Sequence, residues 1–456
     1  MYAASRNIQR PSPLNTSQLL VSQHWTTMGA RWAKCTKEEA PAASAEEGVP
    51  PEATPRPQGP EVAGQIGEAA EGLGGDETSN AAGGAADGAG EPRCGVVRAT
   101  PDAALLEKLQ KRSKCAPPRQ REIFVEECAG GDAITQLKEV VATADGITVV
   151  SANLYYGRCV SATDGAQGVD PARTIAAISA VLENGADVIC LQEVPGGAAP
   201  ESQGKDSYPD LGDFDKDFPK ASFDQWPEEL AKLGAQDGVH IIYAPARNST
   251  MYRCSFGNAL VINTRTMRVD DSSVVVQDCL TEPTEQESLE GRAGVTAVVE
   301  RVGGGGKLGV CCTHLTEKVI GEPGQKQCEQ LEALLAGTLS KPQYEGLPMV
   351  LCGDFNINNV QQMPAASAEF CKSSPFLHPH EAYDPYKRLS DAGFIGSQEH
   401  ALKHGGALDT CWNAACVDYN GYKGPGVRPL AVGIIDPTVN GYVLSDHRWP
   451  VAVYSC

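Results

Sequence analysis

Residues 349–356 read Met-Val-Leu-Cys-Gly-Asp-Phe-Asn: an apolar run, a glycine, and then two polar side chains separated by one residue. An apolar run of four residues bounded by a turn residue is typical of a buried strand. Asp354 and Asn356 are two positions apart, so on extended backbone they project to the same side. A carboxylate and a carboxamide there can hold a metal-bound or phosphate-like oxygen. For this stretch alone, a Gly-Asp turn capped by the asparagine is the alternative.

Other apolar runs end in side chains of catalytic types. They are residues 148–153, 187–193, 308–314 and 441–447, which end in Ser-Ala-Asn, Leu-Gln-Glu, Thr-His and Ser-Asp-His. Together with Gly-Asn-Ala-Leu at 257–260 and Gly-Asp-Phe-Asn at 353–356, this ordered series resembles the endonuclease/exonuclease/phosphatase superfamily of metal-dependent phosphoesterases. The resemblance covers about residues 146–456. Each short motif alone is a weak signal, but six in the family's order are a specific one.

The resemblance implies an α/β fold, a four-layer α/β/β/α sandwich of two mixed β-sheets flanked by helices. The pattern of residues predicts helices and strands in alternation from residue 146 onwards. Helices are predicted at 133–142, 171–184, 227–233 and 325–335. Residues 292–300 and 307–313 are predicted to form a hairpin around the glycines at 303–306.

The resemblance also implies site residues. The catalytic residues would be His314, Asp354, Asn356, Asp409 and His447, the phosphate-binding residues Asn153 and Asn258, and the metal ligands Glu193 and Asp446. Glu193 matches the principal Mg²⁺ ligand of the family, with Mn²⁺ as the expected substitute. Water would attack the phosphorus in line, activated by Asp354 or by His447 held by Asp409. The sequence leaves that choice, and the number of metal ions, open.

One position departs from the family pattern. Gln327 stands where the family often has an arginine, which puts the phosphate contact of that arginine in doubt. Lys318 and Lys326 are the candidate replacements.

The expected activity is Mg²⁺-dependent hydrolysis of a phosphodiester or phosphomonoester, most like that of a nuclease or phosphodiesterase. A sphingomyelinase-like or small-molecule/inositol phosphate hydrolase is the alternative, and a non-catalytic scaffold is the alternative of another class. The expected binding partner is therefore a phosphoester substrate, and nucleic acid is one of the candidates. A net charge of -20 weakens the case for a bulk basic face that binds polynucleotides. Nothing in the sequence indicates an obligate protein partner.

The first quarter of the chain has a different composition. Residues 1–37 are basic and contain no Asp or Glu, which is typical of an organelle transit peptide or of a basic tail. Residues 38–119 read as a largely disordered low-complexity linker, and residues 120–456 as the catalytic domain. No stretch approaches the ~20 apolar residues of a transmembrane helix.

The chain has sixteen cysteines, but no C-x-x-C pair. Several of them lie inside predicted buried strands, where a thiol behaves as a small apolar side chain. We therefore expect a reducing compartment, mitochondrial or of another organelle if residues 1–37 are a targeting signal and cytoplasmic or nuclear otherwise.

Overall fold

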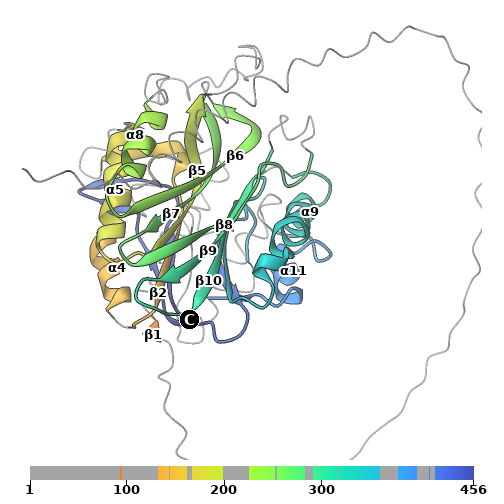
Figure 1. Cartoon of the computed structure of the whole chain (residues 1–456). Coiled ribbons are helices and arrows are strands. Elements are labelled where there is room, and N and C mark those ends of the chain that lie inside the picture. Colours follow the sequence, from red (N-terminus) through yellow and green to blue (C-terminus); the bar gives the residue numbers. More distant parts are fainter. Residues whose placement is uncertain are drawn as a thin grey trace, which may run out of the picture. The chain divides into compact units, whose positions relative to one another are not determined.

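The structure is a computed structural model (Figure 1). It describes residues 93–94, 132–142, 144–161, 167–198, 225–251, 254–282, 291–317, 319–359, 378–397, 410 and 416–456. The predicted basic segment 1–37 lies outside these residues, and so does the predicted linker 38–119 except for Arg93–Cys94. Those two residues form a short strand, β1, paired in parallel with the strand β14 (Arg428–Ile435).

Two large β-sheets and one small sheet organise the described residues. The seven-stranded sheet has the order β1, β14, β17 (Trp449–Ser455), β2 (Ile147–Asn153), β5 (Val188–Ala198), β7 (Cys254–Asn263) and β6 (Val239–Met251). The six-stranded sheet has the order β12 (Ile395–Gly396), β13 (Asp418–Lys423), β11 (Met349–Asp354), β10 (Lys307–His314), β9 (Gly294–Arg301) and β8 (Met267–Gln277). Both sheets are mixed, because β2 and β5, and likewise β10 and β11, run parallel among antiparallel neighbours.

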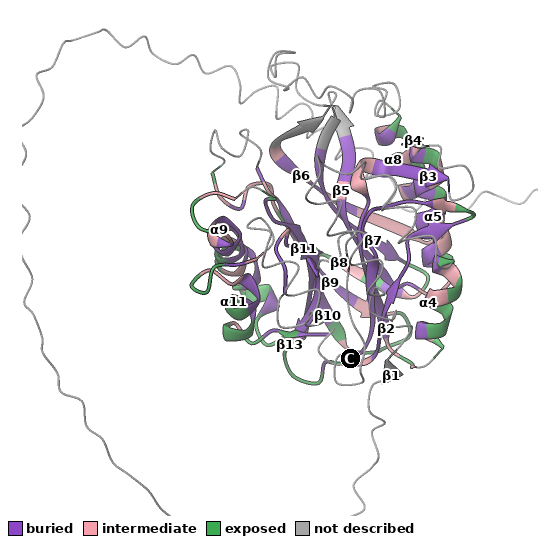
Figure 2. Cartoon of the chain, turned by 180° about the vertical axis from the view of Figure 1, so that it is seen from behind, coloured by how far each residue is buried: buried purple, intermediate pink, exposed green. Residues whose placement is uncertain are grey.

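Helices cover the outer face of each large sheet (Figures 1 and 2). The helices α4 (Ala133–Val141), α5 (Pro171–Glu183) and α8 (Trp226–Gly234) pack on the seven-stranded sheet. The helices α9 (Gln325–Leu334) and α11 (Pro385–Asp391) pack on the six-stranded sheet. A third apolar cluster fills the space between the sheets. The predicted four-layer sandwich is therefore confirmed, and so are the four predicted helices and the β9–β10 hairpin.

The central strands are buried on both faces, which explains why they read as continuous apolar runs. In β10, Cys311 packs towards α9 while its neighbour Cys312 packs between the sheets. Both are free thiols with no exposed surface, and burial raises the pKa of Cys311 to about 12. These cysteines act as small core residues, as predicted.

A small third sheet, which the sequence analysis did not predict, has the order β15 (Thr438–Val439), β16 (Tyr442–Val443), β3 (Arg158–Ser161) and β4 (Gln167–Val169). It joins the segment that follows β2 to the segment that precedes Asp446. Among the helices of the described residues, none is long and apolar enough to cross a bilayer.

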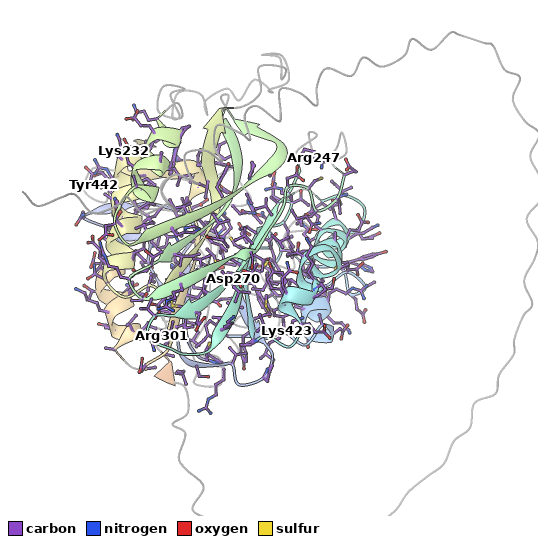
Figure 3. All side chains as sticks on the ribbon, viewed as in Figure 1. Lys232, Arg247, Asp270, Arg301, Lys423 and Tyr442 are labelled. Carbon is purple, nitrogen blue, oxygen red and sulfur yellow. The ribbon has the colours of Figure 1, made fainter. Side chains whose placement is uncertain are left out.

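Charged side chains at the outer surface form exposed ion pairs. Lys232 Nζ lies 3.0 Å from Glu228 Oε1 and 2.7 Å from Glu229 Oε1, and Arg301 Nη1 lies 2.8 Å from Asp145 Oδ1 (Figure 3). Pairs of this kind contribute little to stability in water. Several buried charged residues lie instead at one edge of the two large sheets.

A substitution at Gly157 tests how the segment before β3 packs against Trp226 of α8. It has φ 75°, and a Cβ there would lie 1.9 Å from Cζ2 of the fully buried Trp226. We expect Gly157→Ala to lower the free energy of unfolding by about 3 kcal/mol, because it combines overpacking with a left-handed backbone. Urea denaturation measures this. Gly168→Ala in β4 is the control, since a Cβ there meets nothing within 4 Å. Equal denaturation midpoints for the two variants would contradict this packing.

Candidate active site

The candidate active site lies where strands of the two large sheets end. β2 ends at Asn153, opposite Gln192 of the parallel strand β5. β10 and β11 end at His314 and Asp354, which are opposite each other in the six-stranded sheet. Asn153 Nδ2 donates to Asp354 Oδ2 at 2.9 Å, so one hydrogen bond links the two sheets at this edge. The structure thus brings the polar ends of four apolar runs together.

Glu193 reaches this edge through an irregularity in β5. The pairing of β5 with β7 shifts between Leu191 and Val194, and Glu193 has φ 55°. In a regular strand Glu193 would point to the face opposite Gln192, towards the helices. The bulge instead places Glu193 Oε1 3.2 Å from Asn153 Nδ2, which donates to it. A non-glycine residue with positive φ is strained, and such strain clusters at functional sites.

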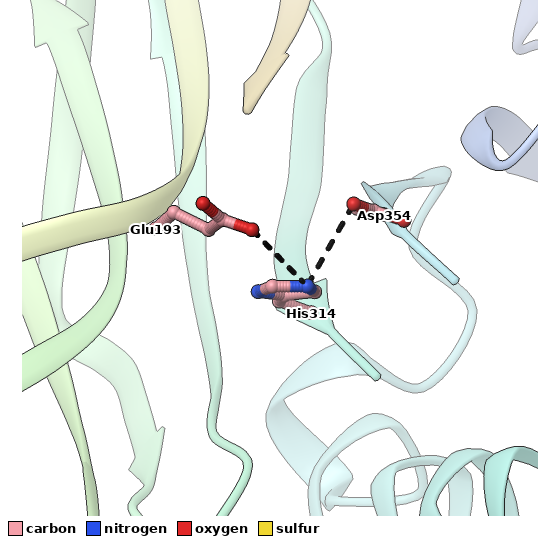
Figure 4. Close-up of side chains that lie close together, drawn as sticks. All are labelled: Glu193, His314 and Asp354. Atoms are coloured by element: carbon pink, nitrogen blue, oxygen red, sulfur yellow. Dashed lines mark ion pairs between the residues drawn. The ribbon is translucent and has the colours of Figure 1, made fainter. Parts of the chain in front are cut away.

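Glu193, His314 and Asp354 form a compact cluster (Figure 4). His314 Nε2 lies 3.9 Å from Glu193 Oε1 and 3.7 Å from Asp354 Oδ2. One ligand atom from each of the three lies within 4.8 Å of the others. Two oxygen donors and one nitrogen donor at this spacing could hold a metal ion.

Asp354 and Asn356 come together by a turn, not by the extended backbone on which the sequence argument relied. β11 ends at Asp354, Asn356 has φ 52°, and its backbone N–H donates to Asp354 Oδ1 at 2.7 Å. A turn therefore follows Asp354, as in the alternative for this stretch, but Asp354 and not Asn356 supplies its side-chain acceptor. It directs both side chains at His314, with Asn356 Nδ2 2.7 Å from His314 Nε2.

His447 forms a second cluster that shares Asp354 with the first. Its Nδ1 lies 2.8 Å from Asp418 Oδ2, and its Nε2 lies 3.7 Å from Asp354 Oδ2 and 3.8 Å from Asp446 Oδ1. Because an ionised carboxylate can only accept, Asp418 holds a proton on Nδ1 and leaves the Nε2 side facing the site. The residue predicted to orient His447 was Asp409, which lies outside the described residues.

Asp418 is a site residue that the sequence analysis missed. It begins β13, the strand next to β11, directly opposite Asp354. The sequence carried no signal that separated Asp418 from Asp409, because the choice depends on which strand pairs with β11. Thr410 has a separate part: its hydroxyl accepts from the N–H groups of Val417 and Asp418, at 3.1 and 3.0 Å.

The two predicted phosphate-binding asparagines differ in their surroundings. Asn153 Nδ2 donates to Glu193 and Asp354, and its Oδ1 accepts from the N–H of Tyr155 at 2.8 Å. It therefore holds two carboxylates at a fixed separation. Asn258, in β7, donates from Nδ2 to Ala293 O at 2.8 Å, and within the described part of the chain its buried Oδ1 has no hydrogen-bond partner.

Burial sets the protonation of the site. It raises the pKa of Glu193 to about 8, aided by the nearby Asp446 carboxylate, and it raises the pKa of Asp446 as well. Burial also raises the pKa of Asp418, against the opposing effect of His447. Burial and the Arg292 guanidinium lower the pKa of His314 to about 4, so His314 is neutral at neutral pH. The carboxylates of this site thus lack enough positive charge around them.

A divalent cation fits this donor set. Glu193 Oε2 and Asp446 Oδ1 are shielded from solvent, and neither has a hydrogen-bond partner among the residues that the structure describes. A buried carboxylate oxygen without a partner is costly, and a hard cation that prefers oxygen ligands relieves that cost. Asp354 lies within 4.8 Å of a Glu193 carboxylate oxygen, and Asp446 adjoins this group through His447 Nε2, which lies 3.8 Å from its Oδ1.

The positive charge next to His314 comes from a residue that the sequence analysis did not single out. Gln327 donates to Thr316 O at 2.8 Å, and Lys326 pairs with Glu329 at 3.6 Å. Lys318 lies outside the described residues. Arg292, just before β9, places Nη1 3.3 Å from His314 Nδ1. Arg292 is the first residue of the predicted hairpin strand 292–300, and nothing in the sequence indicated that its side chain would contact His314.

A family model matches the part of the chain that carries the first cluster. The model of the Endonuclease/Exonuclease/phosphatase family matches residues 150–363, a span that holds Asn153, Glu193, His314 and Asp354. A comparison with curated proteins gives no significant match.

Solved structures with a similar fold include three proteins of different description. An endonuclease/exonuclease/phosphatase from Beutenbergia cavernae is 20% identical with a TM-score of 0.44, covering 68% of this chain and 72% of that one. The human Nocturnin catalytic domain is 17% identical with a TM-score of 0.40, covering 68% and 94%. A mannosyl-6-phosphatase from Bacteroides thetaiotaomicron is 14% identical with a TM-score of 0.41, covering 68% and 100%.

Proposed function

Because the chain belongs to the endonuclease/exonuclease/phosphatase family of phosphoester hydrolases, we propose that it is a Mg²⁺-dependent phosphodiesterase. The observation that carries the proposal is the pair of buried carboxylate oxygens, Glu193 Oε2 and Asp446 Oδ1, that the described residues leave without hydrogen bonds. They lie beside a neutral histidine and beside a His–Asp pair. These are the parts that in-line hydrolysis of a phosphoester requires.

Glu193 and Asp446 are the proposed ligands of the metal ion. When bound, Mg²⁺ supplies a Lewis acid that polarises the phosphoryl group. Asn153 keeps the Glu193 and Asp354 carboxylates apart and correctly oriented for that ion. Mn²⁺ has a similar preference for oxygen ligands and is the expected substitute.

His447 is the proposed general base. Asp418 holds the Nδ1 proton, so the Nε2 lone pair faces the centre of the site. Asp354, the other candidate, already accepts a hydrogen bond on each oxygen, from Asn153 and from the N–H of Asn356. Asp354 then orients the attacking water while His447 removes its proton. His314 and Asn356 donate hydrogen bonds to the charge that builds on the phosphoryl oxygens, with Asn258 as a further phosphate contact.

Hydrolysis by the purified full-length protein tests the proposal. The panel holds single- and double-stranded DNA, RNA, sphingomyelin, inositol phosphates and bis-p-nitrophenyl phosphate, each with Mg²⁺, with Mn²⁺ and with EDTA. We expect cleavage of a diester that EDTA abolishes, and the preferred substrate separates the nuclease, sphingomyelinase and small-phosphoester alternatives. Absence of cleavage of every member by a folded protein that still binds Mg²⁺ would contradict the proposal and favour a scaffold.

Binding of Mg²⁺ should depend on pH in a defined direction. In the folded, metal-free protein the pKa of Glu193 is raised from 4.5 to about 8. The protonated side chain therefore contributes stability that is fully present below pH 4.5 and is lost as pH rises through 8. Mg²⁺ requires the ionised form and releases that proton. We therefore expect Mg²⁺ to raise Tm more at about pH 8.5 than at about pH 6, relative to EDTA. Thermal unfolding at both pH values measures this, and an equal or opposite difference would contradict it.

A further inference from the structure

The environment of His314 contains a conflict that one residue resolves. Arg292 Nη1 lies 3.3 Å from Nδ1 on one side of the ring, and Asn356 Nδ2 lies 2.7 Å from Nε2 on the other. Both neighbours are placed as donors, but a neutral imidazole has only one acceptor nitrogen. The two contacts therefore demand opposite tautomers.

Only one of the two neighbours can change its role. A guanidinium carries N–H donors and no acceptor, so a proton on His314 Nδ1 would face another donor. The Asn356 carboxamide can turn to present its oxygen to Nε2–H, at the expense of its hydrogen bond to Leu315 O at 3.0 Å. While Arg292 is in place, Nδ1 must be the acceptor and the proton must be on Nε2.

Arg292 is held firmly enough to enforce this. Its side chain is only 11% exposed, and its Nη2 donates to Glu317 Oε2. Its backbone carbonyl accepts from the N–H of Leu280 at 2.8 Å, just ahead of β9. An arginine that is fixed at both its backbone and its guanidinium cannot turn away from the imidazole without losing an ion pair.

We propose that Arg292 is a positioning residue that keeps the proton of His314 on Nε2, directed at the centre of the site. Nε2 is the ring atom that faces Glu193 Oε1 and Asp354 Oδ2, at 3.9 and 3.7 Å. On the proposed function, on which this inference rests, that N–H passes from the Asn356 carboxamide oxygen to a phosphoryl oxygen when the substrate binds. Without Arg292, His314 takes the other tautomer and accepts from Asn356 instead of donating to the substrate.

Two-bond ¹⁵N–¹H correlation spectra of the full-length, ¹⁵N-histidine-labelled protein in EDTA read the tautomer directly. His314→Ala identifies the signal by its loss. We expect the Nε2–H pattern in wild type and in Arg292→Lys, which remains a pure donor, and a shift to the Nδ1–H pattern in Arg292→Met. If Arg292→Met does not fold, Arg292→Gln replaces it, because a carboxamide oxygen can accept from Nδ1–H.

Kinetics give the second readout. Arg292→Met should lower kcat roughly 100-fold, the loss expected for one hydrogen-bond donor to a developing anion, with KM changed far less. Arg292→Lys should restore most of the rate. Arg247→Met is the matched control: Arg247 pairs with Asp278 and Glu282 at the surface (Figure 3) and should leave both tautomer and rate unchanged.

The two readouts separate this inference from the proposed function. An Nδ1–H pattern in wild type, or an unchanged pattern in Arg292→Met, overturns the positioning role whatever the activity. If the tautomer shifts as expected but no phosphoester is hydrolysed, the positioning role is supported and the proposed function fails.

Discussion

Glu193→Gln is expected to lower Mg²⁺-dependent hydrolysis by at least ~1,000-fold, because it removes the ligand charge while keeping the shape of the side chain. The same substitution should stabilise the metal-free protein. Ionised Glu193 is disfavoured in the fold, as its pKa of about 8 shows. Since each pKa unit corresponds to about 1.4 kcal/mol, the neutral glutamine should raise the free energy of unfolding above pH 8 by a few kcal/mol.

The opposite signs of these two effects make the test specific. Urea denaturation in EDTA measures the gain in stability, and initial rates with Mg²⁺ measure the loss of activity. Glu193→Asp is the matched control, because it keeps the negative charge but shortens the reach: we expect it to lose activity without gaining stability. If Glu193→Gln loses stability in EDTA, the carboxylate is satisfied without a metal and the assignment of Glu193 as the ligand is wrong.

His447→Ala is expected to lower kcat about 10,000-fold, since it removes the proposed base, and Asp418→Asn should approach that loss. An asparagine amide in place of the carboxylate would donate to His447 Nδ1 and move the imidazole proton to Nε2. A protonated Nε2 cannot accept the proton of the attacking water. The short contact between Asp418 Oδ2 and His447 Nδ1, at 2.8 Å, makes this substitution informative.

Asp409→Asn is the comparison for this experiment. The sequence predicted that Asp409 orients His447, whereas in the structure Asp418 is the carboxylate that contacts this histidine. A large loss in Asp418→Asn with a small one in Asp409→Asn is the expected outcome. The reverse order would return the role to Asp409. Circular dichroism and thermal unfolding of both variants verify that the fold is retained.

The sequence was sufficient to predict the architecture, through the family resemblance, and to name most residues of the candidate site. Strands buried on both faces must be continuous apolar runs, so β2, β5, β10 and β11 are recognisable from their residues. A polar residue at the end of such a run is conspicuous, because burying it without a partner is costly. That local contrast pointed to Asn153, Glu193, His314 and Asp354.

Only the tertiary structure decided how those side chains face one another. The bulge that turns Glu193 and the turn that brings Asn356 beside His314 depend on φ values of 55° and 52°, which strand periodicity does not encode. The choice of Asp418 for His447, and of Arg292 for His314, depends on which strand lies beside which. Residues distant in sequence become partners only through sheet order and register. The pattern of apolar and polar residues therefore determined which groups reach the site, and packing between the sheets determined which of them touch.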